Sequence, residues 1–503
     1  MAVTTDKAGK GTNLQRGGLA LAFAKLFFLI AGYAISIVLT RLVSPETFGL
    51  YGVVSMVIAV PNMVLIQTVL FTVSRPMAAE ITRGLGSYDF LRRRGFRLAA
   101  LLGGLVSLVF LAGADLIAAW LRDPSLAGPL RVVSVIPMLY ALYAVNVGTL
   151  NATRRFGMQA MLDVIMASSK ASLIIGAAAF GYGLAEILGG FTGAAALVLT
   201  LSVILVRVAR PAGVDEAAAV AQREGTQKTP PIAAFAGSLL IFTAVVNLLL
   251  ATDLLMLKHF VVSAQDQASV GFYTSASLVA RVPYSLMNAV SLMMFPLVAT
   301  LHALEDAPRL RHYIAETAKV SALLLCLLAG VAAAASGEIQ RLLFPAAYGA
   351  VADELRLMVW GFSGYSFAVT CAWILNSTER SRIAVLLVVT PLLVVGIAAS
   401  ILVPGKMTEG AALAVALAGA AAVIAALIAL HRVFRAHLQL FFLVKVGAAI
   451  AATEFLGRAW SAEGKIMILA KLAALTIVFV AVILVTRAVT IHEIKELRRA
   501  RTH

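Results

Sequence analysis

The feature that most constrains this chain is a succession of long apolar segments separated by short polar connectors. A helix that crosses the hydrocarbon core of a bilayer needs roughly 20 mostly apolar residues. Hydrophobic residues make up 61% of the chain and charged residues only 13%, about half the charged share of a soluble domain. We therefore predict an all-α integral membrane protein with about fourteen transmembrane helices. The expected spans are residues 17–40, 47–73, 98–120, 130–151, 159–181, 184–206, 234–257, 268–298, 317–336, 354–376, 383–403, 410–431, 438–457 and 465–487.

The distribution of basic residues predicts the orientation in the membrane. With a cytosolic N-terminus, cytosolic segments carry roughly three times as many Lys and Arg residues as external loops. Most of the net charge of +16 is then a topology signal, and no nucleic-acid partner is expected. Residues 1–16 are polar and basic without a cleavage site, which predicts a cytosolic tail. Residues 488–503 form a second basic tail on the same side.

An internal repeat divides the chain. A shift of 222 residues, from Gly49 to Gly271, places residues 48–61 on residues 270–283. The matched pairs include Gly, Tyr, Ser and Pro, and each segment follows a residue suited to cap a helix, Ser44 or Asp266. Coincidence within a narrow composition is the alternative explanation.

The repeat predicts two lobes. Six helices per lobe is an even number, so the lobes would share one orientation and be related by a pseudo-twofold axis along the membrane normal. Residues 17–207 would form the N-lobe and residues 234–434 the C-lobe. The polar, Pro-terminated segment 208–233 would join them in the cytosol. Residues 435–487 would add two helices outside the repeat.

Three stretches resemble one known family. They are the run RLVSPETFGLY at residues 41–51, the run TDLLMLKHF at 252–260 followed by VGFY at 270–273, and LLFP at 342–345 with Tyr348. They are similar to Wzx-type polysaccharide flippases of the multidrug/oligosaccharidyl-lipid/polysaccharide exporter (MOP) superfamily. Leu254 stands where this family often has an Arg.

The resemblance implies a function in cell-surface or exported polysaccharide synthesis. Such proteins move undecaprenyl-diphosphate-linked oligosaccharides from the inner to the outer leaflet of the bacterial inner membrane, by alternating access between two lobes. Lipid-linked oligosaccharide and membrane lipids would be the partners, with a polysaccharide polymerase and co-polymerase as further candidates. A proton or sodium gradient would take the place of a cofactor. Fourteen helices are similar to the lipid II flippase branch, where the last two helices help form a groove for the lipid tail.

Three cations lie far from the ends of their predicted helices. A charge inside a span costs about 2.5–3.5 kcal/mol on insertion scales, so it normally faces a cavity or a partner. We predict that Arg281, Lys25 and Lys170 line a wet cavity and bind the diphosphate, Arg281 with two parallel hydrogen bonds. Internal ion pairs or snorkelling are the alternatives, and Asp163, seven residues before Lys170, is a candidate ion-pair partner.

Other residues are candidates for coupling and for motion. Asp253, Asp163 and Glu454 could bind a proton or sodium ion. Asp253 could instead pair with Lys258, and Glu454 with Arg458, four residues later. Pro61 and Pro283 occupy equivalent mid-helix positions in the repeat. Each removes a backbone hydrogen bond, so we predict kinks that shape the cavity and flex, with static kinks as the alternative.

Other classes of function fit the sequence less well. No phosphate-binding glycine loop, nucleophile elbow or metal-ligand spacing is present, and neither cysteine, Cys326 or Cys371, belongs to a metal motif. We therefore expect no metal and no enzyme. A membrane glycan polymerase or ligase is the alternative of another class, although the longest outer segment is only about 337–353. A lipid II-type flippase or a drug/cation antiporter of the same superfamily is the alternative among transporters.

Overall fold

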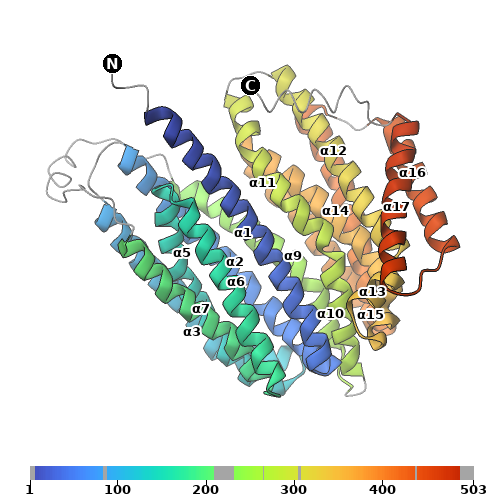
Figure 1. Cartoon of the computed structure of the whole chain (residues 1–503), viewed down its shortest axis with the longest axis horizontal. Coiled ribbons are helices and arrows are strands. Elements are labelled where there is room, and N and C mark those ends of the chain that lie inside the picture. The colour runs from blue at the N-terminus through green and yellow to red at the C-terminus, as the bar shows by residue number, and fades with distance from the viewer. Residues whose placement is uncertain are drawn as a thin grey trace. The chain divides into compact units, whose positions relative to one another are not determined.

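The computed structural model describes residues 6–82, 88–208, 232–263, 266–303, 307–436 and 439–487, and every element in these ranges is a helix (Figure 1). Twelve of the helices are long and apolar enough to cross a membrane. Contacts divide the chain into two compact units, Met1–Asn247 and Leu248–His503. The boundary falls within α9 (Ile232–Phe260), so the first half of that helix belongs to the first unit.

The first unit is a bundle of long helices with one short interruption. A 3₁₀ turn, η1, leads into α4, and η1, α4 and α5 together form one span, Pro124–Ala152. The elements before α9 are α1 (Asp6–Leu42), α2 (Pro45–Thr82), α3 (Tyr88–Trp120), η1 (Pro124–Leu126), α4 (Ala127–Val133), α5 (Ile136–Ala152), α6 (Phe156–Ala179) and α7 (Leu184–Val208).

The second unit contains the remaining helices and one short amphipathic segment. They are α10 (Gln267–Ala280), α11 (Val282–Ala303), α12 (Ala307–Ala334), α13 (Ser336–Leu343), η3 (Ala346–Val351), α14 (Ala352–Ser377), α15 (Ser381–Phe434), α16 (Leu440–Ala459) and α17 (Lys465–Val485).

Two features explain why twelve candidate spans correspond to the fourteen helices that the sequence predicts. Helix α15 contains two spans that meet at Met407, whose backbone is not helical (φ 48°, ψ −120°). Helices α10 and α11 together cover the predicted span 268–298. For the described residues, the prediction of an all-α membrane protein with fourteen helices is confirmed.

Some predicted boundaries change. Helix α1 begins at Asp6, so residues 6–16, expected in a tail, are helical. Residues 209–231 of the predicted linker and the tail 488–503 lie outside the described residues. The pseudo-twofold relation between lobes stays a prediction.

The two repeated prolines have different settings. Helix α2 runs without a break through Pro61. By contrast, Arg281 ends α10 and α11 begins at Val282, so Pro283 is the second residue of a new helix. Hydrogen bonds of α-helical spacing continue across this break, from the Arg281 amide to the Ser277 carbonyl and from the Ser285 amide to the Arg281 carbonyl. The interruption is therefore of the kind that a proline without an amide hydrogen is expected to cause.

The predicted caps also differ. The Ser44 hydroxyl accepts a hydrogen bond from the Thr47 amide at 3.3 Å, as a capping residue does. Asp266 precedes α10 but makes no capping hydrogen bond with its side chain.

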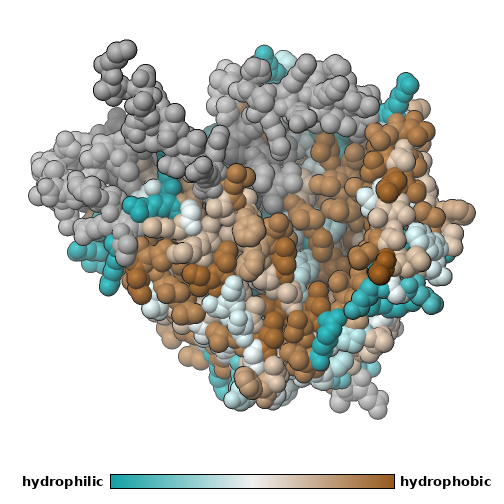
Figure 2. Space-filling model, in the orientation of Figure 1, coloured by the Kyte–Doolittle hydropathy of each residue, from teal (hydrophilic) through white to brown (hydrophobic). Residues whose placement is uncertain are grey.

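Side-chain burial follows the pattern of a protein embedded in lipid. Figure 2 shows hydrophobic residues over most of the coloured surface of the face that it presents. On α3, Leu101 and Leu116 are 73% and 75% exposed. Such exposure is expected of a helix that faces acyl chains, because lipid solvates apolar side chains as well as a protein core does. In a membrane-spanning helix the informative residues are therefore the buried polar and charged ones.

Candidate functional site

The second unit contains an ion pair at the break between α10 and α11. Arg281 Nη2 lies 3.2 Å from Asp253 Oδ1 of α9 and donates a second hydrogen bond to the Leu250 carbonyl oxygen at 2.6 Å. The Asp253 side chain is 1% exposed and that of Arg281 is 13% exposed. Because an unpaired charge in this setting would be costly, each group stabilises the charged form of the other.

Aromatic side chains complete this cluster. The Tyr273 hydroxyl donates to Asp253 Oδ2 at 3.0 Å, so both carboxylate oxygens have a partner. The Arg281 guanidinium lies over the Phe362 ring, 4.8 Å from its centroid. The arrangement connects α9, α10 and α14 at the helix break. Arg281 thus links the break between α10 and α11 to α9 through Asp253. Lys258, the alternative partner of Asp253, donates instead to Gln267 Oε1 at 3.0 Å.

The first unit contains a different pair. Lys25 of α1 and Asp163 of α6 meet at 2.8 Å between Nζ and Oδ2. The Asp163 side chain is 10% exposed, whereas that of Lys25 is 61% exposed. Most of the lysine side chain is therefore accessible, while the carboxylate that it contacts is buried. Long flexible lysine side chains can leave such a pair at modest cost.

Lys170 does not take the partner that its sequence spacing suggested. Its Nζ lies over the Phe191 ring of α7, 3.7 Å from the ring centroid. Asp163, on the same helix as Lys170, pairs with Lys25 from another helix. The alternative of a Lys170–Asp163 ion pair is therefore wrong, because the packing of α1 against α6 brings Lys25 to the carboxylate.

Two further ion pairs join the last two helices, α16 and α17, to the other helices of the second unit. Glu454 of α16 pairs with Arg356 of α14 and, more weakly, with Arg458 at 3.5 Å, the partner expected from its spacing. Lys471 of α17 is 1% exposed and lies 2.6 Å from Glu338 Oε1. Neither Lys471 nor Glu338 is among the candidate residues that the sequence singled out. A separation of 133 residues gave no local signal for this pair.

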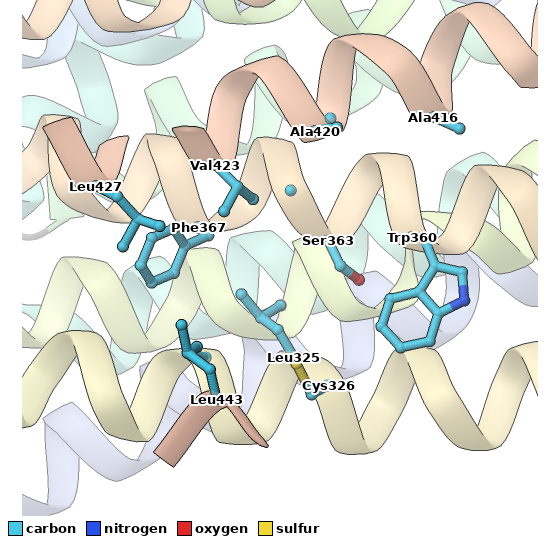
Figure 3. A pocket seen from close by; sticks show the side chains of 13 residues that line it. Leu325, Cys326, Trp360, Ser363, Phe367, Ala416, Ala420, Val423, Leu427 and Leu443 are labelled. Carbon is cyan, nitrogen blue, oxygen red and sulfur yellow. The ribbon is translucent and has the colours of Figure 1, made fainter. Parts of the chain in front are cut away.

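An apolar cavity of about 270 Å³ lies among α12, α14, α15 and α16 in the second unit (Figure 3). Figure 3 shows the side chains of Leu325, Trp360, Phe367, Val423 and Leu443 around it. Ser363 supplies a hydroxyl and Cys326 a thiol. None of the described residues that line the cavity is charged, so its chemistry suits hydrocarbon and not a phosphorylated group.

The two charged clusters belong to different units, each complete within its own helices. In the described part of the chain, no group of three or more His, Cys, Asp or Glu residues is placed to hold a metal ion. The structure thus brings Lys25 to Asp163 and Arg281 to Asp253, and leaves Lys170 and Glu454 in separate environments.

Several solved structures that are similar to this chain are described as a flippase or as transporters. The chain is similar to the lipid II flippase MurJ in an inward closed conformation, at 14% identity and a TM-score of 0.69, covering 92% of this chain and 98% of that one. It is similar to an inward-facing multidrug resistance MATE family transporter of the MOP superfamily, at 12% identity and a TM-score of 0.65, covering 86% and 98%. A MOP superfamily transporter from Pyrococcus furiosus matches at 13% identity and a TM-score of 0.58, covering 84% and 95%. These likenesses define the class: a multi-pass membrane protein with the fold shared by MurJ and the MATE transporters.

The family follows from the sequence match. A family model described as polysaccharide biosynthesis protein matches residues 38–353, well over half of the chain. The chain belongs to this family. A search of curated proteins finds no match.

Proposed function

We propose that this protein is a flippase that moves undecaprenyl-diphosphate-linked oligosaccharide repeat units from the inner to the outer leaflet of the bacterial inner membrane. One observation carries the proposal: a chain of the polysaccharide biosynthesis family has the fold of solved transporters that include a lipid II flippase. The product would serve a cell-surface or exported polysaccharide, and a polymerase and co-polymerase would receive it.

The cations within the membrane-spanning helices support the choice of an anionic head group. Two negative charges on a diphosphate need compensation inside the bilayer, and an intramembrane cation can provide it. Lys25 is the best placed of the three, because its side chain is 61% exposed while its carboxylate partner is buried. Lys170, held over an aromatic ring, is the second. Arg281 is held by Asp253 and Leu250, so we assign it first to positioning the α10–α11 break.

The apolar cavity of the second unit supports a place for the lipid tail. It is lined by hydrocarbon side chains and receives Leu443 from α16, the first of the two added helices. An isoprenyl chain needs only apolar contact, so about 270 Å³ would accommodate a short part of it.

Alternating access between two lobes would move the head group across. We propose Asp253, Asp163 and Glu454 as candidate sites for a coupling proton or sodium ion, and the helix around Pro61 and the break before Pro283 as candidate hinges. Both termini would lie in the cytosol. A lipid II-type flippase is the second candidate, supported by the fourteen helices and by the likeness to MurJ. The likeness to MATE transporters keeps a drug/cation antiporter as a third.

Deletion of the gene followed by leaflet-resolved analysis of lipid-linked oligosaccharide tests the proposal. We expect repeat units to accumulate on the cytosolic leaflet, with restoration by the wild-type chain. Transfer of repeat units to the outer leaflet with failed chain extension would instead indicate a polymerase. An unchanged distribution with altered drug resistance would indicate an antiporter.

A further inference from the structure

Buried oxygen atoms gather around Asp163 in the first unit. Gln159 precedes Asp163 by four residues on α6, so the two side chains lie on the same face of the helix, one turn apart. Tyr143 of α5 lies close enough to Asp163 for its hydroxyl to interact with the carboxylate. All three residues are at least nine-tenths buried: Gln159 is 5% exposed, and Tyr143 and Asp163 are each 7% exposed.

Gln159 Oε1 has no hydrogen-bond partner among the described residues. The Tyr143 hydroxyl can donate only to the Asp163 carboxylate beside it, which leaves the lone pairs of the phenol oxygen unused. A buried polar atom without a partner is uncommon in native proteins and calls for an explanation such as a bound ion or water. Here the carboxylate, the amide oxygen and the phenol oxygen come from two adjacent helices. Hard oxygen ligands of this kind suit an alkali or alkaline-earth cation and not a soft transition metal.

The charge of the site selects the class of cation. Asp163 is the one carboxylate of the three residues, so a monovalent cation would leave the cluster neutral, whereas a divalent one would leave a buried positive charge. In this structure the neutralising charge is the Lys25 ammonium, 2.8 Å from Asp163 Oδ2. If a sodium ion and this ammonium were both bound, the site would carry a buried net positive charge, which is unfavourable in free energy.

We propose that Asp163, Gln159 and Tyr143 form a sodium site for which the side chain of Lys25 is a tethered competitor. The exposure of Lys25 makes the exchange possible, because 61% of its side chain is accessible and its stem can swing away from α6. This part of the inference stands without a transported substrate.

The exchange also deepens the proposed function, and that step rests on it. A diphosphate that attracts the Lys25 ammonium draws it away from the Asp163 carboxylate. The vacated carboxylate can then bind sodium. Linkage requires the reverse effect to be equal, so bound sodium releases Lys25 and raises the affinity for the anion. Lys25 then connects the head group and the coupling ion through one carboxylate.

Equilibrium binding of radioactive sodium ion to the full-length protein in lipid nanodiscs, at constant ionic strength with choline chloride, tests the site. We expect Lys25→Met to bind sodium about ten-fold more tightly than wild type, because sodium no longer competes with the ammonium group. A ten-fold change corresponds to about 1.4 kcal/mol of binding free energy. Asp163→Asn and the double variant Lys25→Met with Asp163→Asn should lose the site. Gln159→Leu and Tyr143→Phe, each combined with Lys25→Met, should weaken it.

A second ion pair in the same unit supplies matched controls. Arg131 and Asp115 are 2.7 Å apart and both more than half exposed. Arg131→Met and Asp115→Asn should leave sodium binding unchanged. Absence of sodium binding to monodisperse Lys25→Met protein, or its persistence in the double variant, would overturn the proposal.

A second measurement separates this inference from the transport function. Inorganic pyrophosphate should raise the sodium affinity of the wild-type protein and leave that of Lys25→Met unchanged. Competition between Lys25 and sodium without a pyrophosphate effect would support the site and contradict its connection to a diphosphate. Leaflet analysis of lipid-linked oligosaccharide remains the separate test of flipping.

Discussion

At the scale of residues, this protein neutralises its buried charges in pairs. Lys25 with Asp163 and Arg281 with Asp253 each combine one cation and one carboxylate inside apolar helices. The pairs differ in exposure: the lysine side chain of the first is 61% exposed, whereas the second is enclosed by Tyr273 and Phe362. From this difference we infer that Lys25 and sodium exchange at Asp163, whereas the Arg281–Asp253 pair positions the break between α10 and α11.

Loss of Arg281 should therefore affect stability as well as export. Arg281→Ala leaves the 1% exposed Asp253 carboxylate without its cation, and removal of one member of a buried pair costs about 3–5 kcal/mol. We expect a clear fall in the thermal unfolding midpoint in detergent. The double variant Asp253→Asn with Arg281→Ala should regain most of it.

Export by the double variant then separates two roles for Arg281. Restored export would indicate a positioning role, and lost export in a stable protein would indicate contact with substrate. Arg131→Ala, which breaks an exposed pair, should cost at most about 1 kcal/mol. An unfolding midpoint of Arg281→Ala equal to that of wild type would contradict the assignment.

At the scale of elements, small residues let helices approach closely. A Cβ added to Gly419 of α15 would lie 2.5 Å from the Gly361 Cα of α14. Membrane helices gain little from the hydrophobic effect, so close van der Waals packing of this kind is a main source of their association. The added pair α16–α17 is attached differently, through the Arg356–Glu454 and Glu338–Lys471 ion pairs.

Substitution of Gly419 should separate α14 from α15. Gly419→Ala forces two backbones apart, and overpacking of this kind costs about 1–3 kcal/mol. We expect a lower unfolding midpoint by differential scanning fluorimetry. Gly396→Ala, in the same helix, is the control: its Cβ would meet nothing within 4 Å, so its midpoint should equal or exceed that of wild type. Equal effects of the two substitutions would contradict the packing argument.

At the scale of the whole molecule, charge asymmetry predicts which side of the membrane each connector occupies. The turn between α16 and α17 should be external, and the turn between α14 and α15 should be cytosolic. In a variant without Cys326 and Cys371, Ser461→Cys should react with a membrane-impermeant maleimide in intact cells. Ser381→Cys should react only after the inner membrane is permeabilised. The reverse pattern would invert the orientation and place both termini outside.

The sequence alone determined the class of fold, since each span must be apolar over roughly 20 residues and this requirement is local. It also singled out Lys25, Arg281, Asp163 and Asp253, because a charge within a span is conspicuous. Only the tertiary structure decided their partners, because the packing of α1 against α6 and the approach of α9 to the α10–α11 break join residues remote in the chain. The same dependence concealed the pairing of Glu338 with Lys471, 133 residues apart.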